Sequence, residues 1–269
     1  MTVDQVKKLV EEKGIEFFLC SFVEMGGAPK AKVVPVTNLE DMAAEGAGFA
    51  GFAAGNMGQG PHDNDMANIP DFSSLTIVPW RPNMAWVAGD VQVDGVPFNY
   101  CPRTILKRQL AKAEDKGYSL HTGVEPEFML LKRGEDGQYS PYDELDVLDK
   151  PCYDLITLNR NFDIMTTLIK HMQELGWVPY ANDHEDANCQ FEINWHFSDS
   201  LTTILLSVLP LSMSSTSYQS APSTSVQLSH TLPRGSRNPL GGSSSVGTSG
   251  VVLFSMRKLH SSLQGPTLL

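Results

Sequence analysis

The chain has 269 residues, of which 41% are hydrophobic and 19% are charged, which is enough for a buried core in one large domain or two ordinary ones. Lys and Arg number 20 against 31 Asp and Glu, a formal net charge of -11, and this excess of negative charge argues against a nucleic-acid binder. The four cysteines form no C-x-x-C pair. Neither a disulfide framework nor a zinc ribbon is indicated, and we expect a reducing, cytoplasmic location.

No membrane segment or export signal is expected. The amino terminus, MTVDQVKKLVEEKGIEFF, is charged and amphipathic, unlike a signal peptide. The late apolar run at 204–213 has about ten residues and contains Pro210, well short of the roughly 20 residues that cross a bilayer.

The first hundred residues predict a mixed α and β domain. A helix is predicted from Val3 to Lys13, with valine and leucine on one face and Gly14 as its stop. The β-rich runs 15–23 and 30–36 flank a turn and predict a hairpin. Further strands are predicted over 75–80, 84–93 and 96–100. Between them, 46–71 is rich in Gly, Ala, Asn and Asp and is expected to be a long connection, mobile or functional.

A second domain is predicted from residue 101. Pro102 suits the first turn of an amphipathic helix that ends at Gly117. A strand over 118–132, a helix over 159–175 and a strand, turn and strand over 178–197 follow. The chain therefore divides into domains at 1–100 and 101–200, with a tail at 201–269.

The tail differs from the rest in composition. Residues 201–269 contain 17 Ser and 7 Thr, four basic residues and no Asp or Glu. No helical or strand period persists there, so the tail is predicted to be disordered. A flexible tail, an O-glycosylated stalk and an out-of-frame translation are the alternatives.

Two groups of acids carry the chemistry. Glu125 and Glu127 lie two apart in a predicted strand, so their side chains share one face. Such a pair is stabilised by a divalent cation, for which Mg²⁺ and Mn²⁺ are the natural choices. A solvent-facing sheet edge is the alternative for this pair.

The second group follows about 60 residues later. Glu185 and Glu192 flank a turn, and Glu192, Asn194 and His196 share a strand face, so four carboxylates can converge. An ordinary solvated hairpin is one alternative. The acid and nucleophile of a glycoside hydrolase is another, because sequence gives no distance between carboxylates.

The motifs G-V-E-P-E-F and H-E-D-A-N-C-Q-F-E together resemble the glutamine synthetase family, with its G-x-E-x-E-[FY] and later G-Q-x-E. The stretches FVEMGGAPKAKVVPV and DNDMANIPDFSSLTIVPW resemble the family's amino-terminal β-grasp domain, and CPRTILKR its link to the catalytic domain. The segments H-E-D-A-N and F-A-G-F-A-A-G look most like the type III branch, which includes γ-glutamylmethylamide synthetases. The resemblance covers about residues 1–200.

The resemblance implies an α+β fold: a β-grasp domain, then part of a glutamine synthetase catalytic domain with an antiparallel sheet. It implies ATP-dependent ligation of glutamate with ammonia or methylamine through a γ-glutamyl phosphate, in a homo-oligomeric ring. By motif, Glu127, Glu185 and Glu192 hold one Mg²⁺ or Mn²⁺, with Glu127 also catalytic, and Glu125 helps to hold a second metal near the ATP phosphates.

The sequence departs from the family pattern in three places. Cys189 replaces the glycine of the G-Q-x-E turn, where a side chain is expected to disturb the backbone. The ammonium-binding aspartate has no clear match, and Asp65 is a loop candidate only. No later motif is recognisable after residue 200. We therefore expect a truncated or frameshifted product with weak or absent activity; a non-catalytic regulatory subunit of full-length homologues and a metal-dependent hydrolase are the alternatives.

Overall fold

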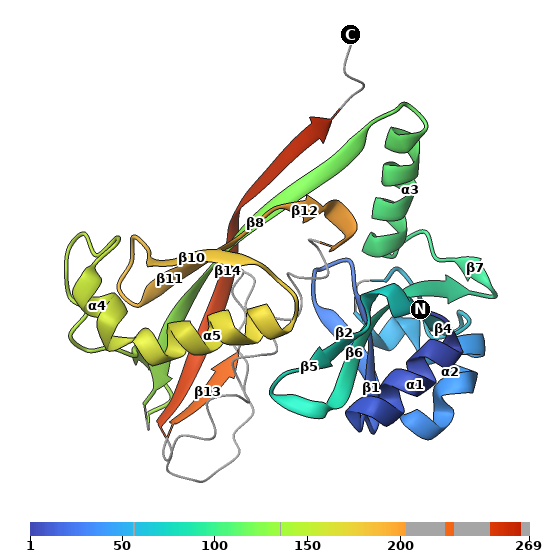
Figure 1. Ribbon diagram of the computed structural model, residues 1–269, viewed down its shortest axis with the longest axis horizontal. Coiled ribbons are helices and arrows are strands. Elements are labelled where there is room, and N and C mark those ends of the chain that lie inside the picture. The colour runs from blue at the N-terminus through green and yellow to red at the C-terminus, as the bar shows by residue number, and fades with distance from the viewer. Residues whose placement is uncertain (56, 135, 203–223, 229–247, 265–269) are drawn as a thin grey trace. The chain divides into compact units, whose positions relative to one another are not determined.

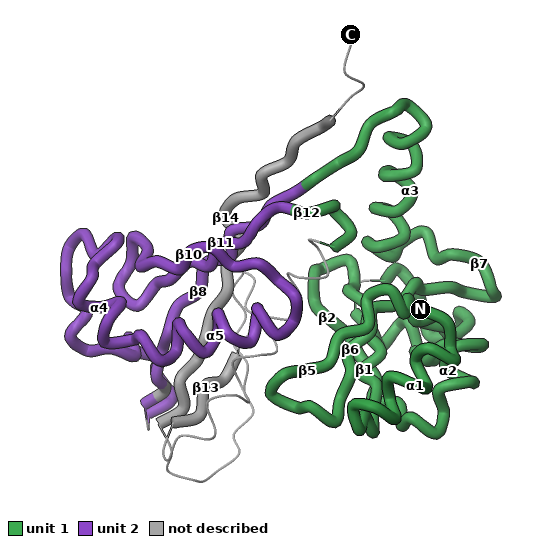
Figure 2. Tube along the Cα trace, in the orientation of Figure 1, with its two compact units in different colours: residues 1–121, 198–205, 261–269 green, residues 122–197, 206–260 purple. Residues whose placement is uncertain are grey.

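The computed structural model describes residues 1–202 except 56 and 135, together with the backbone of 224–228 and 248–264. The chain divides into two compact units, shown in Figure 2. Unit 1 comprises 1–121, 198–205 and 261–269, and unit 2 comprises 122–197 and 206–260.

Unit 1 begins with the predicted helix, α1 (Val3–Lys13). Thr2 caps it by accepting a hydrogen bond from the Gln5 amide, and the Gln5 side chain accepts one from the Thr2 amide in return. This reciprocal pair is a capping box, which satisfies amides that have no partner inside the helix. The helix ends at Gly14 in the left-handed region, with φ 65°. Both predicted ends of the helix are confirmed.

The sheet of unit 1 has the order β2-β1-β6-β4-β3, with β5 and β7 paired to β6. Its strands are β1 (Phe17–Val23), β2 (Pro29–Pro35), β3 (Ala47–Phe49), β4 (Met66–Pro70), β5 (Thr76–Val78), β6 (Arg81–Val93) and β7 (Val96–Pro97). The predicted hairpin of β1 and β2 is confirmed, and β1 pairs in parallel with β6. The β-grasp assignment of this unit stays a prediction.

The core of unit 1 joins its helices to its sheet. Val6 of α1 and Met42 of α2 (Leu39–Glu45) are buried in one apolar cluster with Phe18 and Val87 of the central strands. These side chains are at most 1% exposed, and burial of this kind is the main stabilising contribution to such a unit.

The prediction of a single long connection over 46–71 was wrong at its two ends. There β3 and β4 pair antiparallel, from Ala47 opposite Asn68 to Phe49 opposite Met66, and β4 also pairs with β6. The small residues of this stretch carry no clear alternating pattern, and pairing with the longer strand β6 decides their conformation.

Helix α3 (Pro102–Glu114), which is part of unit 1, is bonded to the rest of that unit by charged side chains. Arg103 Nη2 lies 2.5 Å from Asp71 Oδ2, and Arg103 Nε lies 3.0 Å from Asp90 Oδ1. Lys107, one turn later on the same face, lies 2.5 Å from Asp90 Oδ2. The Arg103 side chain is only 10% exposed, so these ion pairs are less screened than surface pairs.

The sheet of unit 2 has the order β10-β11-β8-β14-β13, with β9 and β12 also paired to β8 (Figure 1). The pairs β10–β11, β11–β8 and β8–β9 are antiparallel, as predicted, whereas β13 and β14 pair in parallel. Its strands are β8 (Ser119–Arg133), β9 (Tyr139–Pro141), β10 (Pro179–His184), β11 (Gln190–Trp195), β13 (Thr224–Leu228) and β14 (Thr248–Gln264), whereas the residues of β12 (Ser198–Asp199) are counted in unit 1. The helices are α4 (Leu155–Arg160) and α5 (Phe162–Glu174), and α5 packs against β10.

The predicted disordered tail falls mainly outside the described residues. Within 201–269 the structure describes residues 201 and 202 and the backbone of β13 and β14. Of the helices in the described part of the chain, none has both the length and the apolar character needed to cross a membrane.

Substituting Arg103→Ala should lower the free energy of unfolding by about 1–2 kcal/mol at pH 7, because Asp71 and Asp90 lose one of their two cations and keep only Lys107. Urea denaturation measures the change. Arg108→Ala is the matched control, since Arg108 lies on the same helix but is exposed and bonds only the Asn99 side chain among the described contacts.

The effect should depend on pH. Burial raises the pKa of Asp71, but hydrogen bonds from Ser73 and the charges of Arg103 and Lys107 outweigh burial, so this pKa lies below its ordinary value of 3.8. A lowered pKa in the folded state gives stability that is complete above the unfolded value and is lost as pH falls through the folded one. The difference between wild type and Arg103→Ala should therefore shrink below about pH 4; a constant difference down to pH 2 contradicts this account.

Candidate metal centre

Three acids lie in one row across the sheet of unit 2. Glu127 on β8 is directly opposite Glu192 on β11, and Glu192 is directly opposite Asp183 on β10. Directly opposite residues of antiparallel strands project from the same face with Cβ atoms about 5 Å apart. The register therefore collects acids that are far apart in sequence on one small area of the sheet.

The structure brings three of the four predicted ligands together. One carboxylate oxygen from each of Glu127, Glu185 and Glu192 lies within 4.8 Å of the other two. Glu127 is 6% exposed and Glu192 9% exposed, whereas Glu185, on the turn after β10, is half-buried. The alternative of a solvated surface hairpin is wrong, because His184 in the same segment is fully buried.

Glu125 is not part of this group of three. It lies two residues before Glu127 on the same strand, and its charge acts on Asp183, the acid at the end of the row. Its predicted role at a second metal stays a prediction. Asp183 was not among the predicted site residues and is the acid that was missed.

Mutual repulsion shows in the titration of the acids. Burial raises the pKa of Glu192 to about 7; a hydrogen bond with Glu185 and the charges of Glu185 and Asp183 act in the same direction, against the lowering effect of Asn194. Burial and the charges of Glu185 and Glu125 likewise raise the pKa of Asp183. A group of buried carboxylate oxygens that is unfavourable alone fits a hard divalent cation such as Mg²⁺ or Mn²⁺.

Two amide side chains hold the acids. Gln190 Nε2 donates a hydrogen bond of 2.5 Å to Glu127 Oε2, while Gln190 Oε1 accepts one of 2.9 Å from the Ala187 amide. Asn194 Nδ2 donates to Glu192 Oε1. Gln190 was not predicted as a site residue, although its place two residues before Glu192 puts it on the same strand face.

Cys189, at the position where the family pattern has glycine, lies in the backbone region that favours glycine. Its φ is 58°, in the left-handed region, and its side chain is fully buried. Sγ accepts a hydrogen bond of 3.3 Å from the Asp143 amide, and burial raises the pKa of the thiol to about 11. The turn still closes, with the Glu185 amide donating to the Gln190 carbonyl at 2.8 Å. The cost of a side chain at this φ is about 1–2 kcal/mol.

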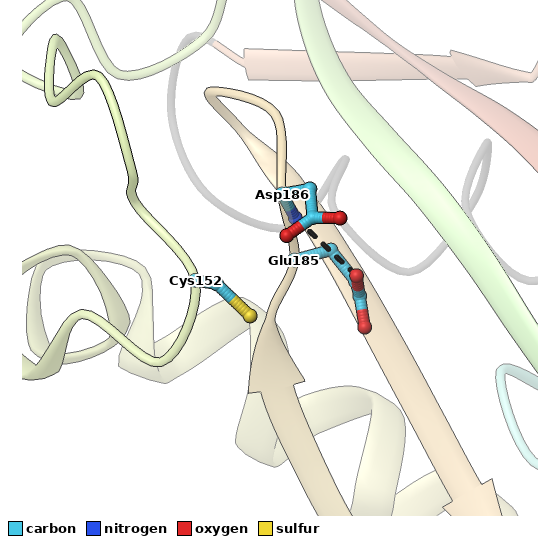
Figure 3. A group of neighbouring side chains, drawn as sticks. All are labelled: Cys152, Glu185 and Asp186. Atoms are coloured by element: carbon cyan, nitrogen blue, oxygen red, sulfur yellow. Dashed lines mark hydrogen bonds between the residues drawn. The ribbon is translucent and has the colours of Figure 1, made fainter.

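A second group of ligand atoms shares Glu185 with the first. It consists of Cys152, Glu185 and Asp186, again within 4.8 Å of one another, and Figure 3 shows Cys152 directed from its loop toward the turn that carries the two acids. Burial and the charges of Glu185 and Asp186 raise the pKa of the Cys152 thiol, and Asp186 is exposed. The buried group made only of carboxylates is therefore the better match to a hard cation.

Two other residues that the sequence analysis considered for the site lie outside the group of three acids. Asp65 is exposed in unit 1, immediately before β4, and its role with ammonium stays a prediction. His196 lies one residue beyond β11, and its ring centroid is 5.0 Å from that of Tyr180.

Comparison with known proteins agrees with the carboxylate motifs. Residues 99–204 match the family model "Glutamine synthetase, catalytic domain", and these residues contain Glu127, Glu185 and Glu192. The matched region belongs to the glutamine synthetase family. The predicted resemblance is thereby confirmed.

The similar proteins include enzymes with two different names. A glutamine synthetase of Rhizobium leguminosarum bv. phaseoli is 42% identical over 203 residues, which are 76% of this chain and 46% of the relative. A glutamate–methylamine ligase of Methyloversatilis universalis is 40% identical over 204 residues, again 76% and 46%. The chain thus spans about half the length of the curated relatives that it matches.

Solved structures give the same match. A ligand-free GmaS structure is similar to this chain with a TM-score of 0.71 and 47% identity, over 75% of this chain and 47% of that one. A GmaS complex with ADP gives a TM-score of 0.71 and 45% identity, over 76% and 48%.

Substituting Glu192→Gln should affect stability and metal binding in opposite directions. The folded pKa of about 7 exceeds the ordinary value of 4.5, so ionisation of Glu192 destabilises the folded state. This destabilisation is absent below pH 4.5 and complete above about pH 7. The variant should raise the free energy of unfolding in EDTA by about 1–2 kcal/mol at pH 8 and change it little at pH 4.5, while weakening Mn²⁺ binding. Urea denaturation at both pH values tests this; lower stability at pH 8 contradicts it.

Proposed function

We propose that this chain carries the carboxylate part of the active site of an ATP-dependent ligase that joins glutamate to ammonia or methylamine through a γ-glutamyl phosphate. The observation that supports the proposal is the convergence of Glu127, Glu185 and Glu192 inside the region matched by the family model. Ammonia and methylamine both stay in the proposal because a relative named glutamine synthetase and one named glutamate–methylamine ligase are about equally similar to this chain.

The three carboxylates would hold one Mg²⁺ or Mn²⁺, which neutralises charge on a transferring phosphoryl group and on the glutamate carboxylate. The residues of this chain hold the ligands in place. Gln190 fixes the Glu127 carboxylate and Asn194 fixes that of Glu192, so neither acid must be ordered when the substrate arrives. Glu127 is also the proposed catalytic residue by the resemblance of its motif, and it is the most buried of the three.

The remaining parts of the activity are also proposals. Glu125 would help to hold a second divalent cation near the ATP phosphates, in agreement with its place on the same strand face as Glu127. A homo-oligomeric ring and a cytoplasmic location are expected by resemblance. The family match stops at residue 204, so we expect the chain as printed to form little product alone.

The metal proposal is tested by titrating the protein with Mn²⁺ and following the EPR signal of the free ion. Glu127→Gln and Glu185→Gln should each weaken binding at least about tenfold, because each removes a charged ligand from a site of three. Glu144→Gln is the matched control, as Glu144 is an exposed acid of unit 2 paired with Lys132. Equal Mn²⁺ affinity in the wild type and the three variants would show that Glu127 and Glu185 hold no cation.

The ligase proposal is tested by γ-glutamyl hydroxamate formation from glutamate, ATP and hydroxylamine, then with methylamine and ammonia. Weak activity that requires Mn²⁺ or Mg²⁺ and is lost in Glu127→Gln is the expected result, with at least about a hundredfold loss. Metal-dependent hydrolysis of a substrate in the absence of ATP would favour the hydrolase instead. Absence of product, together with co-purification with a full-length homologue, favours the regulatory subunit.

A further inference from the structure

A fully buried carboxylate outside the proposed metal ligands lies beside the turn that carries Glu185. The side chains of Asp146 and His184 are both 0% exposed. Asp146 lies between β9 and α4, where its amide donates to the Asp143 carbonyl at 3.1 Å. A buried charge of this kind persists only where its oxygens are well bonded.

The oxygens of Asp146 are bonded to both sides of the turn. Oδ2 lies 2.7 Å from His184 Nε2, the residue before Glu185, and also accepts from the Cys189 amide, on the far side of the turn. Oδ1 accepts from Asn188 Nδ2 at 3.2 Å. One carboxylate therefore bonds residues at both ends of the turn.

Two short paths connect Asp146 with the proposed ligands. His184 Nδ1 lies 2.7 Å from the Glu185 carbonyl oxygen; a carbonyl only accepts, so this nitrogen donates. On the other side, Cys189 precedes Gln190, whose side chain donates to Glu127. The bond to the Cys189 amide also holds the left-handed backbone of that residue, which is unfavourable for a residue with a Cβ atom.

We propose that Asp146 is a positioning residue of the carboxylate site: it holds the turn 184–189 closed and so sets Glu185 and Gln190 relative to Glu127. The inference rests on the proposed metal-dependent function. Asp146 acts through the turn and touches neither metal nor substrate. Residues that orient metal ligands in this way typically change metal affinity 10–100-fold when they are replaced.

The test compares Asp146→Asn and Asp146→Ala with Asp143→Asn in the 269-residue protein. Asp143 is a matched control because it lies in the same segment and is also a poorly exposed acid, but its carboxylate bonds Arg160 at 2.6 Å and Asn161. Mn²⁺ affinity is one readout. The other is amide hydrogen exchange at Glu185 and Cys189 without metal, at a temperature where each variant is folded by circular dichroism.

Asp146→Asn, which keeps the shape but not the charge, should weaken Mn²⁺ binding about tenfold, and Asp146→Ala up to about a hundredfold. Both should speed exchange at Cys189, whereas Asp143→Asn should leave affinity within about threefold. If Asp146→Ala does not fold, Asp146→Asn decides.

Affinity in Asp146→Asn equal to that in Asp143→Asn overturns the inference while the metal site stands. A wild-type protein that binds no Mn²⁺, with Glu192→Gln indistinguishable from it, overturns the proposed function and this inference together.

Discussion

The register between β8 and β11 is the constraint on which the site depends. Glu127 and Glu192 are opposite each other only in this pairing, and a slip of one residue would turn every side chain of one strand to the other face. The neighbouring pair on the opposite face fixes the register: Phe128 lies opposite Phe191, with ring centroids 5.8 Å apart and both side chains at most 1% exposed. Apolar packing on one face thus determines which acids meet on the other.

This arrangement sets function against stability. The aromatic face gains free energy by burial, while the acid face costs free energy because buried carboxylates repel one another and lose solvent. The raised pKa of Glu192 records that cost. Conflict of this kind between local chemistry and folding is expected at functional sites.

Much of the fold could be predicted from the sequence, because strand and helix periods and capping residues are local signals. The helix from Val3, the hairpin strands and the three acids Glu127, Glu185 and Glu192 were predicted from such signals and from motifs. Alternation along a strand tells which residues share a face, but it gives no register between strands. Asp183 was therefore missed, and β3 and β4 were missed because β6 determines their conformation.

Asp146 could not have been found by pattern at all. It lies outside any helix or strand, 38 positions before His184, and its importance comes only from the three donors that the fold places around it. The glycine of the family motif is also not needed for the left-handed conformation of the turn. Cys189 adopts that conformation with hydrogen bonds on both its amide and its sulfur. The conformation of the turn is thus maintained by tertiary contacts, so the identity of residue 189 alone does not decide whether the turn forms.

The two groups that share Glu185 differ in the metals that they favour. The carboxylate group offers hard oxygens in a buried row, whereas the group with Cys152 offers a thiol whose pKa is raised by burial and by the acids around it. A softer metal must displace the thiol proton before it gains the sulfur ligand, while a hard cation gains charge neutralisation from Glu127 and Glu192 at once. The negative charge of the acids on this face therefore also disfavours the thiolate of Cys152. The same electrostatics would favour a hard cation such as Mg²⁺ or Mn²⁺ over a softer metal at Glu185.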